Sequence, residues 1–440
     1  MKYYSTNGKA PIADLHKAVV KGLAEDRGLY MPEKINKLPK EFFDNIEKMS
    51  FQEIAYTVAS AFFGEDVDPD ALHDIVYDTL QFDCPVVNVK DNIYTLELFH
   101  GPTLAFKDVG ARFMARLLQY FIKQENNHKE VNVLVATSGD TGSAVANGFL
   151  GVDGIHVYVL YPKGKVSPIQ ECQFTTLGKN ITAIEVDGVF DDCQALVKNA
   201  FMDAELNEHM KLTSANSINV ARFLPQAFYY FNAYARMKEI ANTQHLSPNT
   251  QLVMCVPSGN FGNICAALFG HEMGLPIKRF IAANNANDIF YNYLQTGKYE
   301  PKPSKQTLAN AMDVGDPSNF ARIYDLYGKS HAKITSLISG ATYSDEQIKA
   351  TMRECYKDSR YILDPHGACG YQALKDGLQA GEVGVFCETA HPAKFKEKVD
   401  DILGIDVEIP ERLAAFMRGQ KQSVPMSKDF ADFKDYLMRQ

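Results

Sequence analysis

The sequence predicts an α/β protein built from two doubly wound domains with a cleft between them. Apolar runs of strand length alternate with helical runs along most of the chain, which is typical of parallel sheets covered by helices on both faces. The predicted strands are too many for one sheet, and 440 residues suffice for two or three domains. Glycine-rich turns follow several of the strands, at the positions where parallel sheets place their ligands.

Three regions are expected along the chain. Residues 1–95 form a mainly helical N-terminal region that carries no recognisable chemistry. Residues 96–245 form the first α/β domain, and residues 246–440 form the second. Residues 287–328 are expected to be an irregular insertion in the second domain, because closely spaced prolines exclude a continuous helix there.

The N-terminal region contains two predicted helices and a strand. Residues 51–64 (FQEIAYTVASAFFG) predict a helix that a glycine ends. Residues 68–82 predict a second helix, because they begin with an acidic turn and a proline. Pro85 precedes the predicted strand VVNV.

In the two α/β domains each predicted strand is followed by a helix. The predicted strands of the first domain cover residues 130–136, 155–160 and 181–188, and those of the second cover residues 251–257, 279–284 and 383–390. The second domain also contains a helix at residues 344–359, which Ser344 and Gln347 begin as a capping box. The tail is predicted to be an amphipathic surface helix from Ser427.

The composition excludes several classes of function. The net charge of −9 is spread along the chain without a basic block, so nucleic acid is not an expected partner. The first residues, MKYYSTNGKAPIADL, lack the apolar core of a signal peptide, and no run reaches membrane-spanning length. The eight cysteines lack the C-x-x-C or His/Cys spacing of a metal site. We therefore expect a cytoplasmic protein with free thiols, no metal ion and no membrane partner.

Lys107 is the first candidate for chemistry. It lies in the segment LELFHGPTLAFKDVGARFMARLLQYF, between a loop containing Gly101 and Pro102 and a helix with one apolar face. A lysine in apolar surroundings beside a helix N-terminus has its cation disfavoured, which makes its amine a usable nucleophile. Taken alone, however, the segment favours a simpler interpretation, a helix-starting lysine whose ammonium reaches solvent.

Two strand-to-helix turns have the composition of anion sites. Residues 137–143 (TSGDTGS) contain four hydroxyl side chains and two glycines, more than a tight turn with one cap needs. Residues 258–263 (SGNFGN) lack the lysine of a nucleoside-triphosphate loop and the glycine spacing of a dinucleotide loop. A small phosphorylated cofactor or substrate therefore remains as the ligand of the second turn.

Two further stretches carry polar groups that also have simpler explanations. Residues 387–392 (CETAHP) place Thr389 and His391 at a strand end, where a plain helix start is as good an explanation as a functional turn. A single histidine such as His391 at a helix start is more often a capping or surface residue than a catalytic one. Residues 212–222 gather several hydrogen-bond donors that suit a phosphate or a carboxylate. These donors are Asn216, Ser217, Asn219 and Arg222. The alternative for this stretch is a helix N-cap followed by a surface arginine.

A reactive lysine, a phosphate site and a second anion site together indicate pyridoxal phosphate, which needs a lysine anchor, a phosphate site and a partner for its pyridine nitrogen. The motifs LFHGPTLAFKD, ATSGDTGSA, TSANSINVAR, VPSGNFGN and TAHPAKF, in this order and at these separations, resemble those of the threonine synthase family. The likeness covers nearly the whole chain. It implies a tryptophan-synthase-β-like fold with pyridoxal 5'-phosphate between two α/β domains. It also implies the last step of threonine biosynthesis, in which O-phospho-L-homoserine and water give L-threonine and phosphate.

The resemblance implies roles for individual residues. Lys107 matches the lysine that carries the cofactor, and Thr389 matches the hydroxyl that faces the pyridine nitrogen. The residues that match the cofactor-phosphate loop are Gly259, Asn260, Phe261, Gly262 and Asn263. Those that match the substrate site are Thr137, Ser138 and Gly139 at the carboxylate, and Thr141, Asn216, Ser217, Asn219 and Arg222 at the phosphate. The contacts of Asp140, Asn263 and His391 stay open.

Two other functions are compatible with the same cofactor. A related lyase, such as a serine/threonine dehydratase or a phospholyase, would share the cofactor site. Residues Asn216 to Arg222 argue against a dehydratase, which has no leaving phosphate to bind. A non-catalytic cofactor-binding homologue is disfavoured because both Lys107 and Thr389 are present. We expect a monomer or a homodimer without an allosteric domain.

Overall fold

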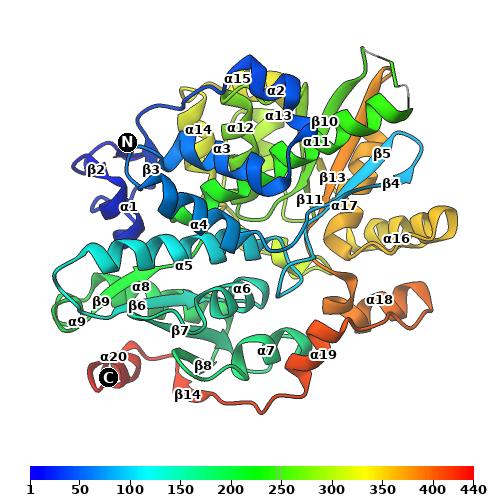
Figure 1. Ribbon diagram of the computed structural model, residues 1–440. Helices are drawn as coiled ribbons and strands as arrows, with labels where there is room; N and C mark the ends of the chain where they lie inside the picture. Colours follow the sequence, from blue (N-terminus) through cyan, green and yellow to red (C-terminus); the bar gives the residue numbers. More distant parts are fainter. Residues whose placement is uncertain (245, 248) are drawn as a thin grey trace. The chain divides into compact units, whose positions relative to one another are not determined.

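The structure is a computed structural model and describes residues 1–244, 246–247 and 249–440. The chain divides into two units. Unit 1 comprises Met1, Met31–Gly101 and Phe223–Glu408, and unit 2 comprises Lys2–Tyr30, Pro102–Arg222 and Ile409–Gln440. Each unit contains a mainly parallel sheet with associated helices (Figure 1), which confirms the predicted α/β class.

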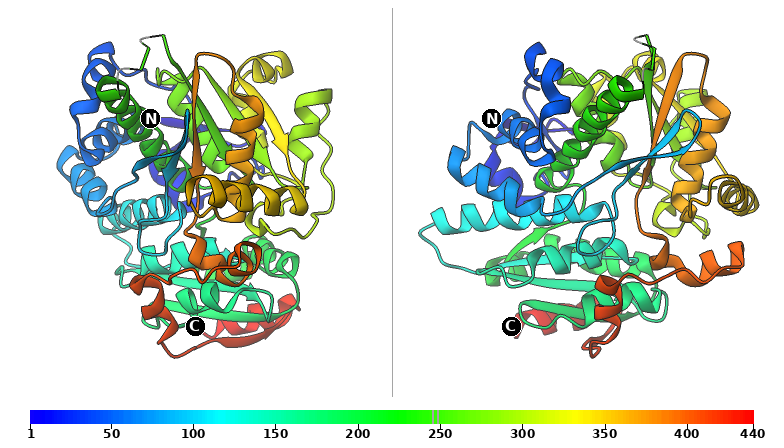
Figure 2. Two further views of the ribbon diagram at one scale, coloured as in Figure 1. Left: turned by 90° about the vertical axis from the view of Figure 1, so that its right-hand side faces the viewer. Right: turned by 45° about the vertical axis from the view of Figure 1, so that its right-hand side comes forward.

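Unit 1 contains a six-stranded sheet with the strand order β12-β11-β10-β13-β5-β4. Its strands are β4 (Val86–Lys90), β5 (Ile93–Glu97), β10 (Gln251–Pro257), β11 (Arg279–Asn284), β12 (Ile338–Thr342) and β13 (Glu382–Glu388). Neighbours pair in parallel except β4 and β5, which pair antiparallel. Figure 2 shows orange β13 beside the green strands of this sheet. Every residue of β13 is buried, as a central strand of a parallel sheet requires.

The helices of unit 1 differ in how they begin, and several of them follow a residue whose side chain caps the helix. They are α2 (Lys40–Asn45), α3 (Phe51–Phe63), α4 (Pro69–Thr79), α11 (Ala227–Gln244), α12 (Gly262–Glu272), α13 (Ile289–Thr296), α14 (Phe320–Leu326), α15 (His331–Leu337), α16 (Asp345–Ser359), α17 (Pro365–Gly377) and α18 (Lys396–Leu403). Short 3-10 turns are η1 (Ile46–Lys48), η2 (Leu224–Gln226), η3 (Asn310–Met312) and η4 (Pro392–Phe395). The capping box predicted at Ser344 and Gln347 is confirmed, and Ser50 with Glu53 forms a second one.

Unit 2 contains a five-stranded, all-parallel sheet with the order β14-β8-β7-β6-β9. Its strands are β6 (Val131–Ala136), β7 (Ile155–Pro162), β8 (Ile181–Asp187), β9 (Lys211–Ser214) and β14 (Val424–Ser427). Its helices are α1 (Leu15–Lys21), α5 (Lys107–Gln124), α6 (Asp140–Phe149), α7 (Pro168–Thr175), α8 (Phe190–Met202), α9 (Ala204–His209), α10 (Val220–Phe223), α19 (Glu411–Met417) and α20 (Phe430–Met438). The short strands β1 (Lys2–Ser5) and β2 (Ala13–Asp14) form an antiparallel pair, and β3 (Tyr30–Pro32) lies where the chain passes from unit 2 to unit 1.

The N-terminal region does not form a separate helical region as predicted. Residues 2–30 belong to unit 2, whereas residues 31–101 belong to unit 1. The physical reason is strand pairing: β5 extends the sheet of unit 1 because Gly384–Glu388 of β13 pairs with it in parallel, and β4 then adds to its free edge. The predicted helices in residues 51–64 and 68–82 are confirmed as α3 and α4.

The other boundaries also differ from the predicted ones. The predicted boundary at residue 245 lies outside the described residues, and α11 before it belongs to unit 1, where it packs against α3 and α12. The tail from Ile409 belongs to unit 2, because β14 pairs in parallel with β8 and α20 packs against α8. Within the predicted insertion the middle is irregular, but helices α13 and α14 occupy its two ends.

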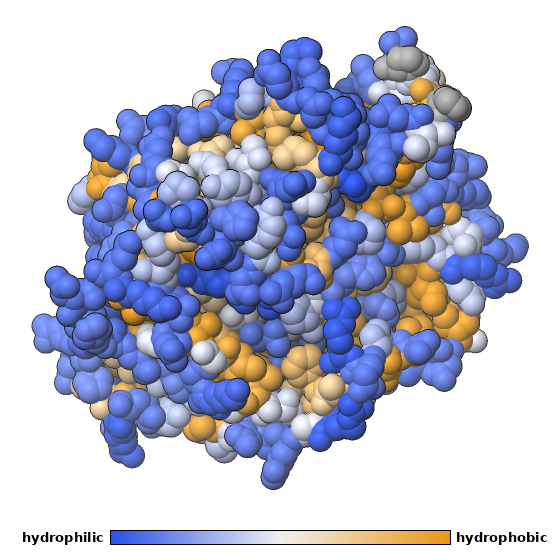
Figure 3. Space-filling model, in the orientation of Figure 1, coloured by the Kyte–Doolittle hydropathy of each residue, from blue (hydrophilic) through white to orange (hydrophobic). Residues whose placement is uncertain are grey.

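Polar residues cover most of the face drawn in Figure 3, and apolar ones are interspersed among them. In the described part of the chain, no helix combines the length and the hydropathy that crossing a membrane requires. All eight cysteines are free, and seven of them are buried.

Candidate active site

Lys107 begins helix α5, as the sequence predicts. The residue is half-buried, and its Nζ donates a hydrogen bond to Thr141 Oγ1 at 2.8 Å. The same nitrogen lies 5.6 Å from the centroid of the Phe106 ring, a distance at which an aromatic face attracts a cation. The structure therefore brings the predicted anchor lysine together with one of the predicted substrate-site hydroxyls.

The turn before Lys107 is fixed by Asp108. This carboxylate is 1% exposed and accepts hydrogen bonds from Thr103 N at 2.9 Å and Thr103 Oγ1 at 2.6 Å. Leu104 in the same turn has a φ of +61°, in the left-handed region that non-glycine residues rarely adopt. Sequence reasoning did not single out Thr103 or Asp108, although both stand in the motif LFHGPTLAFKD.

Residues 137–143 form the turn between β6 and α6. Thr137 is buried, and its Oγ1 accepts hydrogen bonds from Gly139 N at 2.9 Å and Gly142 N at 2.8 Å. Gly139 has a φ of +148°, and a Cβ there would lie 2.7 Å from the Gln170 side chain, so only glycine fits. The Thr137 hydroxyl thus closes the turn, whereas Ser138 is exposed and Thr141 half-buried, and both can meet a ligand.

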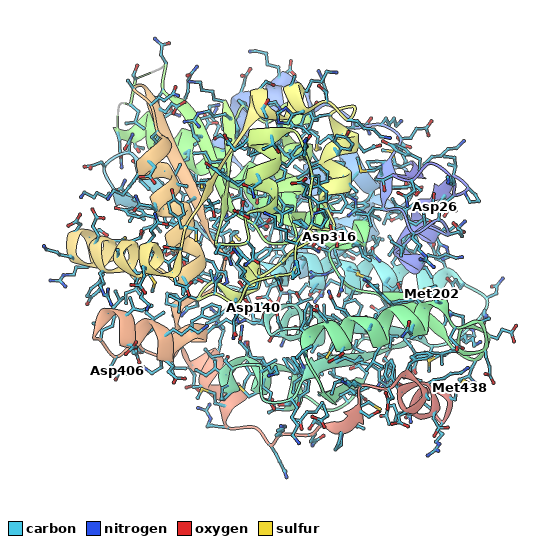
Figure 4. The ribbon with its side chains drawn as sticks, turned by 180° about the vertical axis from the view of Figure 1, so that it is seen from behind. Asp26, Asp140, Met202, Asp316, Asp406 and Met438 are labelled. Atoms are coloured by element: carbon cyan, nitrogen blue, oxygen red, sulfur yellow. The ribbon has the colours of Figure 1, made fainter. Side chains whose placement is uncertain are left out.

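Asp140, labelled in Figure 4, is the first residue of α6. It is 7% exposed, and its Oδ1 accepts a hydrogen bond from Gln170 Nε2 at 3.1 Å. The Gln170 side chain therefore contacts both Asp140 and the Gly139 position. Nothing in the local sequence pairs Gln170 with this turn, because the contact depends on how α7 packs against α6.

The stretch from Asn216 to Arg222 divides into accessible and buried groups. Asn216 and Ser217 are half-buried, and Asn216 Oδ1 has no hydrogen-bond partner among the described groups. Asn219 is fully buried, and its Nδ2 donates to Val19 O at 2.9 Å and Ser214 O at 3.2 Å. Its Oδ1 accepts from Ala221 N at 3.0 Å, so both the nitrogen and the oxygen of this side-chain amide are hydrogen-bonded to the main chain.

Arg222 is 1% exposed and is not the surface arginine of the alternative interpretation. Its Nε donates to Ala215 O at 2.6 Å, and its Nη1 donates to Lys107 O at 3.2 Å. A Cβ on Gly110 would lie 2.3 Å from Arg222 O, so α5 approaches this residue closely. Arg222 therefore ties the Asn216–Arg222 stretch to the first turn of α5.

In unit 1, residues 258–263 connect β10 to α12. Phe261 has a φ of +65°, and its buried ring packs against Phe290 with centroids 4.6 Å apart. A Cβ on Gly259 would lie 2.7 Å from Ala311 O and 2.9 Å from Met312 Cα. The turn thus combines a left-handed residue and a glycine at a close backbone approach, at the positive end of an eleven-residue helix.

The two asparagines of this turn bind other protein groups. Asn263 Nδ2 donates to Pro257 O at 2.9 Å, and its Oδ1 accepts from Ser258 Oγ at 3.0 Å and Ile264 N at 2.9 Å. Asn260 Oδ1 accepts from Ser318 N at 2.6 Å. Since these side chains hold the turn, its backbone N–H groups are the donors best suited to a phosphate.

A buried arginine supports the same turn, and the sequence did not predict its role. Arg322 is fully buried, donates from Nη1 to Asn319 Oδ1 at 2.9 Å and lies 4.0 Å over the Phe223 ring. Asn319 N in turn donates to Asn260 O at 3.2 Å. Burial lowers the pKa of Arg322 to about 9. Its position within the irregular insertion gave no signal in the sequence.

Thr389 directly follows β13 and is 7% exposed. His391 caps η4, because its Nδ1 accepts a hydrogen bond from Ala393 N at 3.0 Å. The His391 ring also packs edge-on against Phe99, with centroids 5.1 Å apart. These contacts agree with the capping interpretation of His391 and involve no reacting group.

The residues present fit pyridoxal phosphate. The turn at Gly259 and Phe261 offers backbone donors at a helix N-terminus, where a Cβ on Gly259 would collide with Ala311. Thr389 offers a hydroxyl at a strand end, and the Lys107 amine lies beside the Thr141 hydroxyl. Backbone donors at a helix N-terminus, a hydroxyl and an amine are the kinds of group that this cofactor requires.

Three family models together match nearly the whole chain. A model for pyridoxal-phosphate-dependent enzymes matches residues 82–387. A model for the threonine synthase N terminus matches residues 2–80, and a model for the threonine synthase C-terminal region matches residues 367–437.

Threonine synthases are also similar to the chain over its full length. The enzyme from Serratia marcescens is 43% identical over 438 residues, which cover 100% of this chain and 99% of that protein. The crystal structure of threonine synthase from Escherichia coli has a TM-score of 0.91 at 43% identity, covering 100% of both chains. A threonine synthase from Brucella melitensis, solved with pyridoxal phosphate bound, has a TM-score of 0.92 at 34% identity, covering 100% of this chain and 99% of that one.

Proposed function

The chain belongs to the threonine synthase family of pyridoxal-phosphate-dependent lyases, and we propose which of its residues convert O-phospho-L-homoserine and water into L-threonine and phosphate. The main support for this function is the full-length similarity, since relatives named threonine synthase are 42% and 43% identical to the chain over 438 residues. The 2.8 Å hydrogen bond between Lys107 Nζ and Thr141 Oγ1 supports the assignment of the anchor.

Pyridoxal phosphate, when bound, supplies an electron sink for negative charge that develops on the substrate carbons. We propose that Lys107 anchors it, and that the backbone of Gly259, Asn260, Phe261, Gly262 and Asn263 holds its phosphate. Thr389 faces its pyridine nitrogen. A neutral hydroxyl partner leaves that nitrogen largely unprotonated, whereas an aspartate would keep it charged.

The substrate carboxylate is assigned to the turn at residues 137–139. In this proposal Thr137 shapes the turn through its two backbone hydrogen bonds, while Ser138 and the backbone of Gly139 meet the carboxylate. Thr141, Asn216 and Ser217 meet the substrate phosphate, because they are more accessible than their neighbours. Asn219 and Arg222 contribute by holding this stretch and the start of α5, through their main-chain hydrogen bonds.

Lys107 is proposed to move the protons of the reaction. Once the substrate amine has displaced it, its neutral amine takes a proton from the α carbon and then one from the β carbon. The Cγ–O bond breaks and phosphate leaves towards the donors at Thr141, Asn216 and Ser217. A proton then returns to the γ carbon, water adds its hydroxyl to the β carbon and a proton returns to the α carbon, while the remaining proton leaves with the phosphate. This role requires the Lys107 amine to be neutral before each proton that it takes.

The competing functions differ in what they release. A serine/threonine dehydratase or a phospholyase would release ammonia, and a non-catalytic homologue would release nothing. We also propose a cytoplasmic location, which the free thiols support, and a monomeric or homodimeric state.

The test measures products from O-phospho-L-homoserine with the purified, cofactor-loaded protein. Phosphate and L-threonine should appear in equal amounts, and ammonia should not accumulate. Ammonia formed from L-serine or L-threonine at a comparable rate would favour the dehydratase. Normal cofactor binding without any product would favour the non-catalytic homologue.

A further inference from the structure

A buried cluster of three titratable side chains lies beside the proposed cofactor site within unit 1. It consists of Glu388, Asp364 and His366, whose relative exposures are 0%, 0% and 2%. We call it the Glu388 cluster. No step proposed above uses it, and no group of three or more His, Cys, Asp or Glu side chains in the described chain could hold a metal ion. The cluster therefore needs another explanation.

Asp364 is the centre of the cluster and begins helix α17. Its Oδ1 accepts from Gly367 N at 2.8 Å, and its Oδ2 accepts from His366 N at 3.2 Å and from the His366 ring at Nδ1, 2.5 Å away. His366 Nε2 accepts a hydrogen bond from Ala311 N at 3.1 Å. Because Nε2 acts as an acceptor, the ring carries its proton on Nδ1 and donates it to Asp364.

Glu388 is the third member and ends strand β13. Its Oε1 accepts from Asp364 N at 3.0 Å, while a Cβ on Gly367 would lie 2.0 Å from its Oε2. Burial, and then the Asp364 carboxylate, raise the pKa of Glu388 well above its usual range. Despite burial, His366 and the hydrogen bonds of the cluster lower the pKa of Asp364. Among the described groups Asp364 accepts three N–H hydrogen bonds and Glu388 accepts one, so this geometry favours Asp364 as the carboxylate of the pair and Glu388 as the neutral acid.

The neighbouring strand β5 carries a second carboxylate next to Glu388, which disfavours a charged Glu388. Glu97 on β5 stands in register with Glu388, and two like charges at such positions repel each other. Glu97 accepts hydrogen bonds from Tyr361 Oη at 2.6 Å, and its Oε1 lies 3.0 Å from His100 Nε2. Glu97 thus has partners for its carboxylate, whereas Glu388 has a carboxylate beside it.

The two ends of the cluster touch the two proposed cofactor contacts of unit 1. Glu388 is followed directly by Thr389, the proposed partner of the pyridine nitrogen. At the other end, Ala311 donates its N–H to His366, and its carbonyl oxygen fills the space where Gly259 would carry a Cβ. A hydrogen-bonded path therefore runs from the Thr389 strand end through Asp364 and His366 to the turn under the phosphate loop.

We propose that the Glu388 cluster positions Thr389 and the Gly259 turn relative to each other, and so sets how tightly and in what orientation the cofactor is held. Its members are positioning residues and do not touch the substrate. Groups that orient a ligand's direct contacts in this way typically change its affinity by about 10- to 100-fold when removed, as measured for metal sites. The inference rests on the proposed roles of Thr389 and Gly259.

The test uses apo-protein to which pyridoxal phosphate is added, and it measures the dissociation constant, the absorption spectrum of the bound cofactor and the unfolding temperature of the apo form. His366→Phe keeps an aromatic ring against Phe395 but removes both nitrogens. It should weaken cofactor binding about tenfold or more and alter the spectrum. Glu388→Leu should do the same, whereas Glu388→Gln should bind like the natural protein, because an amide replaces a neutral acid as donor and acceptor.

Glu382→Gln is the matched control, since Glu382 stands at the opposite end of the same strand, β13. It should lower the unfolding temperature and leave the cofactor constant unchanged. Natural affinity and spectrum in both His366→Phe and Glu388→Leu would overturn the inference, as would equal losses in Glu388→Gln and Glu388→Leu. If His366→Phe does not fold, the two Glu388 variants decide. Thr389→Val and Gly259→Ala separate the two proposals, because unaltered cofactor binding in both would overturn the proposed site itself.

Discussion

Asn219 and Asn216 stand three positions apart, but they differ in burial and in hydrogen bonding. Asn219 donates both amide hydrogens to main-chain oxygens and accepts from Ala221 N, with no exposed surface. Asn216 is half-buried, and its Oδ1 has no partner among the described groups. A side chain whose hydrogen bonds are all used by the backbone supports a loop, whereas an accessible one can bind a ligand.

Alanine substitutions at these two positions should separate stability from substrate binding. Asn219→Ala should lower the free energy of unfolding by about 2 kcal/mol, because it leaves buried main-chain groups unpaired. Asn216→Ala should change stability by no more than about 0.5 kcal/mol and raise KM for O-phospho-L-homoserine about tenfold. Urea unfolding and steady-state kinetics measure the two effects. The reverse pattern would contradict the proposed division of roles.

At this scale the sequence predicted which segments carry chemistry but not which atoms remain available. The position of Lys107 at a loop-to-helix junction followed from local breakers and periodicity, and the structure confirms it. The burial of Arg222 could not be predicted, because it depends on the approach of α5 at Gly110. Glu388, Asp364 and His366 were missed for the same reason, since only the packing of α17 against β13 brings them together.

Helix α5 connects the proposed anchor lysine to the stretch at Arg222. Gly110 lies one turn after Lys107, and its lack of a side chain lets the helix pass against the main chain of Arg222. Arg222 in turn donates to the carbonyl oxygen of Lys107 at 3.2 Å. The position of Lys107 therefore depends on the packing of the whole first turn of α5.

Gly110→Ala should disturb this turn. The new Cβ would lie 2.3 Å from Arg222 O, and relieving that overlap should cost about 1–3 kcal/mol and lower kcat. The control is Gly377→Ala in α17, where the nearest atom to the new Cβ is a flexible one, Ile281 Cδ1 at 3.3 Å. That variant should be neutral or up to about 1 kcal/mol more stable. Thermal unfolding that ranks the two variants in the opposite order would refute this account of α5.

Most elements could be predicted because strand and helix periodicities alternate clearly, and β6, β7, β8, β10, β11 and β13 all lie where expected. The tail shows the limit of such reasoning. Only a surface helix from Ser427 was predicted there, yet strand β14 forms and tolerates Pro425 because β14 is the edge strand of the sheet in unit 2. Segments far apart in sequence also join one unit through contacts that no local pattern records, as α11 does with α3.

At the scale of the whole molecule, an ion-paired glutamate holds three strands of unit 1 together. Glu382 on β13 accepts from Arg279 on β11 through Nη2 at 2.7 Å and Nε at 3.0 Å, and from Lys278 Nζ at 2.9 Å. Strand β10 lies between β13 and β11, so these hydrogen bonds span it. The Arg279 hydrogen bonds lower the pKa of Glu382 from about 4.5 to about 2.

This pair predicts a component of acid sensitivity. Because the folded-state pKa of Glu382 is depressed, its stabilising contribution is complete above about pH 4.5 and is lost as the pH falls towards about 2. Glu382→Gln should therefore cost about 2 kcal/mol at neutral pH and progressively less in acid. Unfolding temperatures measured across this pH range check the prediction, with Glu346→Gln on the exposed face of α16 as a neutral control. A cost that grows on acidification would contradict it.

The measurement that tests the central claim most directly is the identification of the lysine that carries the cofactor. Borohydride reduction of the cofactor-loaded protein, followed by proteolysis and mass spectrometry, locates the modified residue. The account predicts a single modified peptide containing Lys107, and loss of both the modification and phosphate release in Lys107→Ala. Modification of another lysine, or phosphate release at the natural rate by Lys107→Ala, would contradict it.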